Sequence, residues 1–150
     1  MTTQASEILL YDNREYLFDT HPLETYFKLG GTNVPFMVDT TMCWRGYVGT
    51  WTIDNDELRL ISIYGHIAEE PAKAIASRAF RHNVNYDDPA LCRIATIKAI
   101  FQGCDGPIFA HWYSGPIEAL DSESRSVELF AEVKRGRIVS LRTAPTGEQA

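Results

Sequence analysis

Tight-turn sequences between short apolar segments constrain the fold of this chain more than any other feature. Asp12-Asn13 separates two such segments near the start, Asp54-Asn55-Asp56 separates another pair, and Lys134-Arg135-Gly136 separates the last pair. Asp, Asn and Gly tolerate the left-handed backbone conformation that tight hairpin turns require. The pattern predicts roughly seven to nine short strands, most of them in antiparallel pairs.

The expected fold is α+β and mainly antiparallel β, a meander that forms a curled sheet or an open barrel with one or two helices. A chain of 150 residues is long enough to bury one hydrophobic core. We therefore predict a single globular domain at 7–143, with flexible tails at 1–6 and 144–150.

Helical signals occur in three places. Pro22 favours the first turn of a short helix at 23–29. The segment 68–90 is rich in Ala, with acidic residues before its Pro and basic residues near its end, so we predict a helical insertion there. The segment 91–101 fits both a strand and a helix, and we interpret it as a strand that passes into a helical turn.

The run 43–53 is the densest aromatic stretch of the chain. From Trp44 onward, even positions face one side of a predicted strand and odd positions face the other. Neither side is cleanly polar, which indicates a strand covered on both sides or one with a ligand or partner over its second face. Later in the chain, a phase shift near Leu60-Ile61 predicts a β-bulge, and 108–113 is predicted to be a strand.

The composition disfavours several classes of partner. The 14 Lys and Arg against 20 Asp and Glu give a formal net charge of -6, with no run of basic residues, so nucleic acid is not expected as a partner. Three Cys without CxxC spacing favour reduced thiols. The sequence shows no signal peptide and no membrane span, so we predict a cytoplasmic protein without membrane contact.

Three stretches resemble a widespread family of small, uncharacterised bacterial proteins. The first stretch comprises a strand at 8–11 followed by the start of a short helix at 22–24. The second is the run 43–51, and the third is the segment 108–115. The shared strands are similar to CWRGYVGTW and to FA(D/H)W(F/Y)SG, and this chain has His111 where relatives usually carry an acidic residue. The resemblance covers most of 7–120 and implies no established activity.

Few residue patterns indicate a reaction. Cys43 lies close to Arg45, whose charge lowers a thiol pKa, so Cys43 could act as a nucleophile with a His as base. We favour a small buried residue at a strand start, because Cys is among the most buried residue types. The four His lack metal-binding spacings, and neither a metal nor a cofactor is expected. The sequence contains no phosphate-binding loop, dinucleotide fingerprint, nucleophile elbow or zinc-protease motif.

The aromatic and Arg residues remain as candidates for recognition, because Trp, Tyr and Arg dominate interface hot spots and also fill small barrel cores. We predict that Trp51 and Trp112 are mainly core residues and that Arg45 and Tyr47 take part in surface recognition. His111 is predicted to be partly exposed at a sheet edge. The candidate binding residues are Trp44, Arg45, Tyr47, His111, Trp112 and Ser114.

Two functional hypotheses follow. The first is a small protein of bacterial or phage origin that binds another protein without catalysis, through one sheet face or the insertion. An acidic compact domain suits an inhibitor or immunity-type protein that competes for a basic surface. The second is an enzyme or small-molecule-binding protein with a pocket around Cys43, Arg45, His111 and Ser114, in which Arg45 holds an anionic group.

Overall fold

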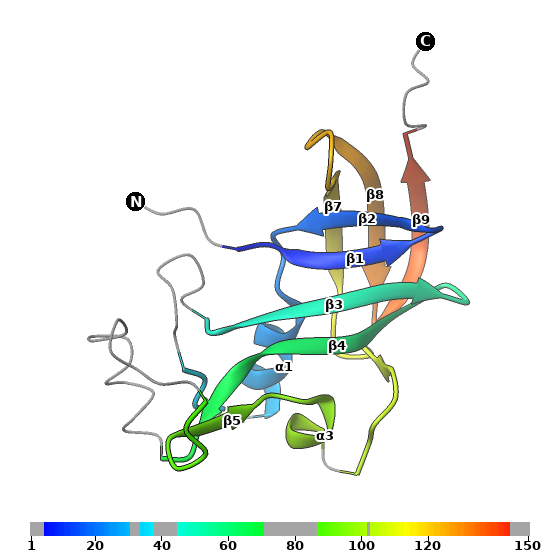
Figure 1. Ribbon diagram of the computed structural model, residues 1–150. Helices are drawn as coiled ribbons and strands as arrows, with labels where there is room; N and C mark the ends of the chain where they lie inside the picture. Colours follow the sequence, from blue (N-terminus) through cyan, green and yellow to red (C-terminus); the bar gives the residue numbers. More distant parts are fainter. Residues whose placement is uncertain (1–4, 31–33, 38–44, 71–86, 102, 145–150) are drawn as a thin grey trace.

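A computed structural model describes residues 5–30, 34–37, 45–70, 87–101 and 103–144. These residues form a mainly β domain with a nine-stranded sheet and two short helices (Figure 1). The elements are β1 (Glu7–Tyr11), β2 (Arg14–Phe18), α1 (Pro22–Gly30), β3 (Tyr47–Asp54), β4 (Glu57–Ala68), β5 (Cys92–Ile94), α3 (Ile97–Ile100), β6 (Ile108–Phe109), β7 (Gly115–Asp121), β8 (Val127–Lys134) and β9 (Arg137–Thr143).

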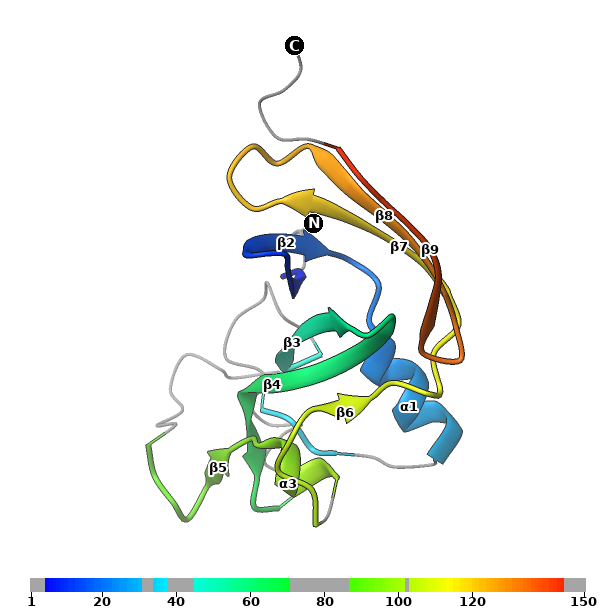
Figure 2. The ribbon, with the colours of Figure 1, turned by 90° about the vertical axis from the view of Figure 1, so that its right-hand side faces the viewer.

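The sheet curls into a ring that is not a regular barrel (Figures 1 and 2). Strands follow one another in the order β3-β1-β2-β7-β8-β9-β4, and β3 also pairs with β4. The β1–β3 pair is parallel and the other pairs are antiparallel. At the seam of the ring, β9 meets β4 at one residue pair, Glu57 opposite Arg137. The predicted curled, mainly antiparallel sheet is confirmed.

The three hairpin turns lie where the turn sequences predict them. Asp12 and Asn13 have φ values of 52° and 60°, and Asn55 and Asp56 have values of 54° and 60°. In the last hairpin, Gly136 has a φ of 81°, and a Cβ there would lie only 2.6 Å from the carbonyl oxygen of Ala110. Glycine is therefore required at this turn for both its conformation and its close contact.

The predicted bulge in β4 is confirmed. Trp51 lies opposite Leu60 and Thr50 opposite Ser62, so Ile61 is the extra residue on β4. The bulge changes which residues of β4 face inward, from Leu58 and Leu60 before it to Ile63 and Gly65 after it.

The core fills the interior of the ring. Its largest fully buried side chains include Trp51, Tyr16, Tyr47 and Phe18. Helix α1 packs against this core through Phe27, whose ring meets that of Tyr47 edge to face at a centroid distance of 6.0 Å. Figure 2 shows α1 below the curve of β7, β8 and β9. Neither described helix is long and apolar enough to cross a membrane.

Two helical predictions are tested by the described residues, and a third is tested in part. The helix at 23–29 is confirmed as α1, and the strand followed by a helical turn at 91–101 is confirmed as β5 and α3. The predicted helical insertion at 68–90 is wrong at its first residue. Ala68 is the last residue of β4 and pairs with Cys92. Residues 71–86, which carry most of that predicted helix, lie outside the described residues.

The predicted strand at 108–113 is wrong beyond its second residue. Only Ile108–Phe109 pairs with β4, as β6. The chain then turns, because the N–H of His111 donates to Phe109 and the N–H of Tyr113 donates to Ala110. These local bonds compete with strand pairing and turn the chain towards β7, so His111 lies in a turn rather than at a sheet edge.

Candidate functional site

A fully buried carboxylate, Glu7, lies at the inward-facing start of β1. Its Oε1 accepts a hydrogen bond from the indole N–H of Trp51 at 2.8 Å. Its Oε2 accepts one from the backbone N–H of Gly49 at 2.9 Å and one from the Arg45 guanidinium at 2.8 Å. A buried charge is tolerated when it is paired and hydrogen-bonded in this way. Glu7 thus links β1 to β3 and to Arg45, which lies two residues before the start of β3.

Arg45 is held between this carboxylate and an aromatic ring. Its side chain is 9% exposed, and its guanidinium carbon lies 5.3 Å from the centre of the Tyr47 ring. Such a cation–π contact adds to the ion pair with Glu7. The Nε of Arg45 is buried and has no hydrogen-bond partner among the residues that the structure describes.

Tyr47 extends the cluster to helix α1. Its hydroxyl donates to Oε2 of Glu24, in the first turn of α1, at 2.6 Å. His21, directly before the helix, has a buried Nδ1 that no described residue hydrogen-bonds. We call Glu7, His21, Glu24, Arg45 and Tyr47 the Arg45 cluster, which joins β1, α1 and β3.

Burial shifts the pKa values in the Arg45 cluster. It raises the pKa of Glu7, and the donors Gly49, Trp51 and Arg45 oppose that increase. Burial raises the pKa of the Tyr47 hydroxyl, and the bond to Glu24 raises it further. Burial also lowers the pKa of His21, and the nearby charge of Arg45 adds to this effect. The groups that oppose or add to the effect of burial, Gly49, Trp51, Arg45 and Glu24, all belong to the fold, so the main contacts of the cluster are made within it.

The burial of this cluster differs from the surface role expected for two of its members. Tyr47 is 1% exposed, and Arg45 is directed at Glu7. Both side chains point inward because each binds a carboxylate from a distant part of the sequence. Arg45 binds Glu7, and Tyr47 binds Glu24. The candidates Cys43 and Trp44 lie outside the described residues.

The remaining candidates do not converge with Arg45. His111 is exposed and lies beside the Trp112 ring at a centroid distance of 5.4 Å. The indole N–H of Trp112 donates to the backbone carbonyl of Pro22 at 2.7 Å, and the Ser114 hydroxyl accepts from the backbone N–H of Arg135 at 2.9 Å. Within the described residues, no hydrogen bond, ion pair or ring contact joins Arg45, His111 and Ser114.

The core prediction for the two Trp is confirmed for Trp51, which is 0% exposed. Trp112 is partly buried and packs against the core, with its ring 4.7 Å from that of Tyr26 on α1. Sequence reasoning missed Glu7, His21 and Glu24. A signal for Glu7 exists, because it shares the inward face of its strand with Leu9, and a carboxylate on an apolar face requires a partner.

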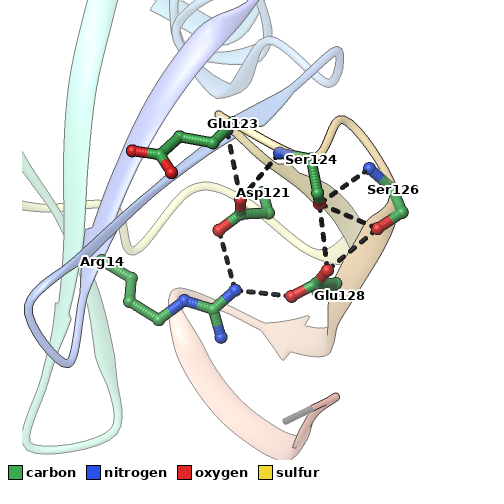
Figure 3. Close-up of polar contacts among 6 residues, drawn as sticks. All are labelled: Arg14, Asp121, Glu123, Ser124, Ser126 and Glu128. Carbon is green, nitrogen blue, oxygen red and sulfur yellow. Dashed lines mark hydrogen bonds and ion pairs between the residues drawn. The ribbon is translucent and has the colours of Figure 1, made fainter. Parts of the chain in front are cut away.

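A second polar cluster closes the turn between β7 and β8 (Figure 3). The Arg14 guanidinium, from β2, binds Asp121 at 2.8 Å and Glu128 at 2.5 Å. Asp121 also accepts the backbone N–H groups of Glu123 and Ser124, at 3.1 and 3.0 Å. The contact with Arg14 lowers the pKa of Asp121 to about 2.

Among the residues that the structure describes, no group of three or more His, Cys, Asp or Glu could hold a metal ion.

The outward side of the sheet carries a different feature. The residues of β1, β3, β4 and β5 that face away from the core include no Asp, Glu, Lys or Arg over a continuous area. Register places Val48 opposite Tyr64, Ile8 opposite Thr50, and His66 opposite Ile94. We call this area the outer sheet face, formed by Ile8, Leu10, Val48, Thr50, Thr52, Ser62, Tyr64, His66 and Ile94.

Three of the six exposed large apolar side chains in the described part of the chain lie on the outer sheet face. Ile94 is 67% exposed, Tyr64 is 65% exposed and Leu10 is 38% exposed. Among the described residues of these strands and their neighbours, charged side chains appear at its margin, where Glu15 lies opposite Leu10 and Arg59 opposite Thr52. Because 23% of the whole chain is charged, an area of this kind is unusual for it.

Fold and site together define a curled-sheet domain with a buried carboxylate network inside and an uncharged sheet face outside. Comparison of this chain with protein-family models, with curated proteins and with solved structures gives no match.

Proposed function

We propose that this protein is a small module that binds another protein, without catalysis, through its outer sheet face. The observation that carries the proposal is the exposure of Tyr64 and Ile94 within an area that lacks charged residues. Exposed apolar patches with polar rims are typical of protein-binding surfaces. Tyr in particular is enriched at interface hot spots, because it buries a large area with few rotatable bonds.

The shape of this face favours a macromolecular partner. Its residues lie on the outside of a curled sheet, and Tyr64 and Ile94 project from neighbouring strands. Small molecules bind in concave sites that bury most of their surface. A protein can instead cover several adjacent strands at once, and thus bury both side chains.

The overall charge supports an inhibitor or immunity-type role. A chain with a net charge of -6 attracts basic partners over long range, which raises the rate of encounter. In this proposal, the acidic remainder of the surface guides a basic partner, and the outer sheet face makes the desolvated contact.

Affinity capture with matched variants tests this proposal. Tyr64→Asp and Ile94→Asp each place a charge on the outer sheet face, whereas Leu29→Asp places one on α1 at a side chain that is 70% exposed. We expect a partner protein to be retained by the parent chain and by Leu29→Asp, and to be lost with the other two variants. Circular dichroism confirms that each variant is folded. Equal recovery with all four proteins would contradict the proposal.

A second candidate function is the binding of a small polar molecule at the Arg45 cluster. Its specific support is that two buried nitrogen atoms there, Nε of Arg45 and Nδ1 of His21, have no hydrogen-bond partner within the described part of the chain. A ligand that accepted a hydrogen bond from Nε would raise the melting temperature of the parent chain. In a thermal-shift screen of metabolites, this candidate requires a stabilising compound whose effect disappears in Arg45→Ala and persists in Lys98→Ala.

A further inference from the structure

The outer edge of β9 is a second feature that the proposed function does not use. Along one side, β9 pairs with β8 from Arg137 to Thr143. On its other side, it pairs with β4 only at Arg137, and the N–H of Ile138 donates to the carbonyl of Asp56. Beyond that point no described strand pairs with this edge. Figures 1 and 2 show β9 as the last strand of the curved β7-β8-β9 part of the sheet.

The direction of the backbone groups follows from the ladder. The N–H of Ala144 donates to the carbonyl of Glu128, so it points towards β8. Because successive residues of a strand point their N–H and carbonyl groups to opposite sides, Thr143 and Leu141 direct theirs away from β8. These groups form a short template onto which another strand could add.

The charge of this edge is opposite to that of the chain as a whole. Residues 134–143 include no acidic residue, and their four basic side chains are all exposed: Lys134, Arg135, Arg137 and Arg142. Arg142 lies over the ring of Phe130 on β8, with its guanidinium carbon 5.0 Å from the ring centre. The guanidinium of Arg137 forms an ion pair with the carboxylate of Glu57 at 3.1 Å. The two carboxylates of β8 lie one strand inside the edge, because Glu132 lies opposite Ser140 and the carbonyl of Glu128 accepts from the N–H of Ala144.

This charge distinguishes between two possible occupants. A second copy of the chain that paired β9 with β9 would bring two basic strands together, which is destabilising. An acidic strand would instead place its carboxylates beside Arg142, the basic residue in the unpaired part of β9, while it completes the backbone ladder. We propose that the β9 edge binds an extended acidic peptide segment by strand addition.

In this arrangement, the backbone of the peptide supplies affinity and its carboxylates supply selectivity. Its N–H and carbonyl groups pair with those of Leu141 and Thr143. Val139, which is 60% exposed, becomes partly covered by the incoming strand. The ring is thereby extended by one strand at the edge that its seam leaves unpaired.

Binding of synthetic peptides tests the proposal. The probes are a small panel of acidic peptides in which Glu alternates with Val or Thr, and a matched panel with Lys in place of Glu. Isothermal titration at low salt should show binding of acidic peptides and at least about tenfold weaker binding of Lys peptides. Hydrogen exchange of the Leu141 and Thr143 amides should slow when an acidic peptide binds.

Two pairs of variants separate strand addition from simple charge attraction. Thr143→Pro removes the outward N–H and should weaken binding about tenfold, whereas Thr143→Val keeps it and should bind normally. Arg142→Glu should abolish the preference for acidic peptides, whereas Lys98→Glu, the same change of charge on α3, should not. Near-ultraviolet circular dichroism verifies folding. The proposal is overturned if no acidic peptide binds. It is also overturned if Thr143→Pro binds acidic peptides as tightly as the parent chain, or if Lys98→Glu abolishes the preference for acidic peptides. Binding at the outer sheet face is a separate question, because Tyr64→Asp leaves this edge intact.

Discussion

At the scale of single residues, Glu7 connects several distant parts of the molecule. Its two oxygens accept from Trp51, Gly49 and Arg45, and Arg45 in turn lies against Tyr47, which binds Glu24 on α1. The four hydrogen bonds among these contacts all join residues that are far apart in the sequence. Removal of one partner would leave buried donors unsatisfied, which is costly in the protein interior.

Glu7→Gln should therefore destabilise the fold. The amide offers an N–H₂ group to donors that need an acceptor, so at least one of the three hydrogen bonds is lost. We expect a loss of about 1–3 kcal/mol in the free energy of unfolding, measured by urea denaturation at neutral pH. The control is Glu15→Gln on the exposed side of β2, where a change of less than about 0.5 kcal/mol is expected. Equal effects for both variants would contradict the role of Glu7.

Asp121 should make stability depend on acid pH. Its pKa is lowered in the folded state from 3.8 to about 2, chiefly by Arg14. The unfolded chain therefore takes up a proton at a higher pH than the folded chain does, so stability falls as pH drops from about 4 to about 2. Urea midpoints should decline less over this range in Asp121→Asn than in the parent chain. Glu123→Gln, an exposed residue of the same turn, should follow the parent chain, and an unchanged decline in Asp121→Asn would argue against the Arg14 contact.

Residue-level reasoning from the sequence succeeded where a side chain's own size decides its place. Trp51 was predicted to be core because a large ring in an alternating strand favours burial, and it is fully buried. Tyr47, which was predicted at the surface, is buried because its hydroxyl finds Glu24 on a helix. Such a partnership depends on how distant elements pack, and no local pattern contains that information.

At the scale of elements, the turn sequences determine three hairpin pairs. Hairpins β1–β2, β3–β4 and β8–β9 lie where Asp, Asn and Gly permit positive φ angles, and the bulge at Ile61 follows from the phase of the apolar residues. The strand at 108–113 was predicted too long, because its apolar residues pack against the core from a turn. Burial explains apolar residues in both strand and turn, so periodicity alone cannot separate them.

The close approach of β1 and β3 can be tested at a single glycine. A Cβ at Gly49 would lie 2.7 Å from Oε1 of Glu7 and 2.9 Å from Nε1 of Trp51. Gly49→Ala should therefore displace the buried hydrogen bond between them and cost about 1–3 kcal/mol in thermal or urea unfolding. Gly106→Ala is the matched control, since no atom lies within 4 Å of its Cβ position. If the two variants were equally stable, the close packing around Glu7 would be refuted.

At the scale of the whole molecule, the ring separates two kinds of surface. Its inside holds the core and the Arg45 cluster, and its outside carries the uncharged outer sheet face and the basic edge of β9. The curled sheet was predictable from the number and length of the segments. The parallel β1–β3 pair and the seam between β4 and β9 were not, because they depend on the closure of the ring rather than on neighbouring residues.

Site-specific photo-crosslinking in cells can show what covers the outer sheet face. A photoreactive amino acid is introduced in place of Tyr64 and, in a separate protein, in place of Leu29, which is similarly exposed on α1. We expect a discrete crosslinked product with a partner protein from position 64 and none from position 29. The absence of a product at position 64, or the same product from both positions, would contradict the proposal that this face binds a protein.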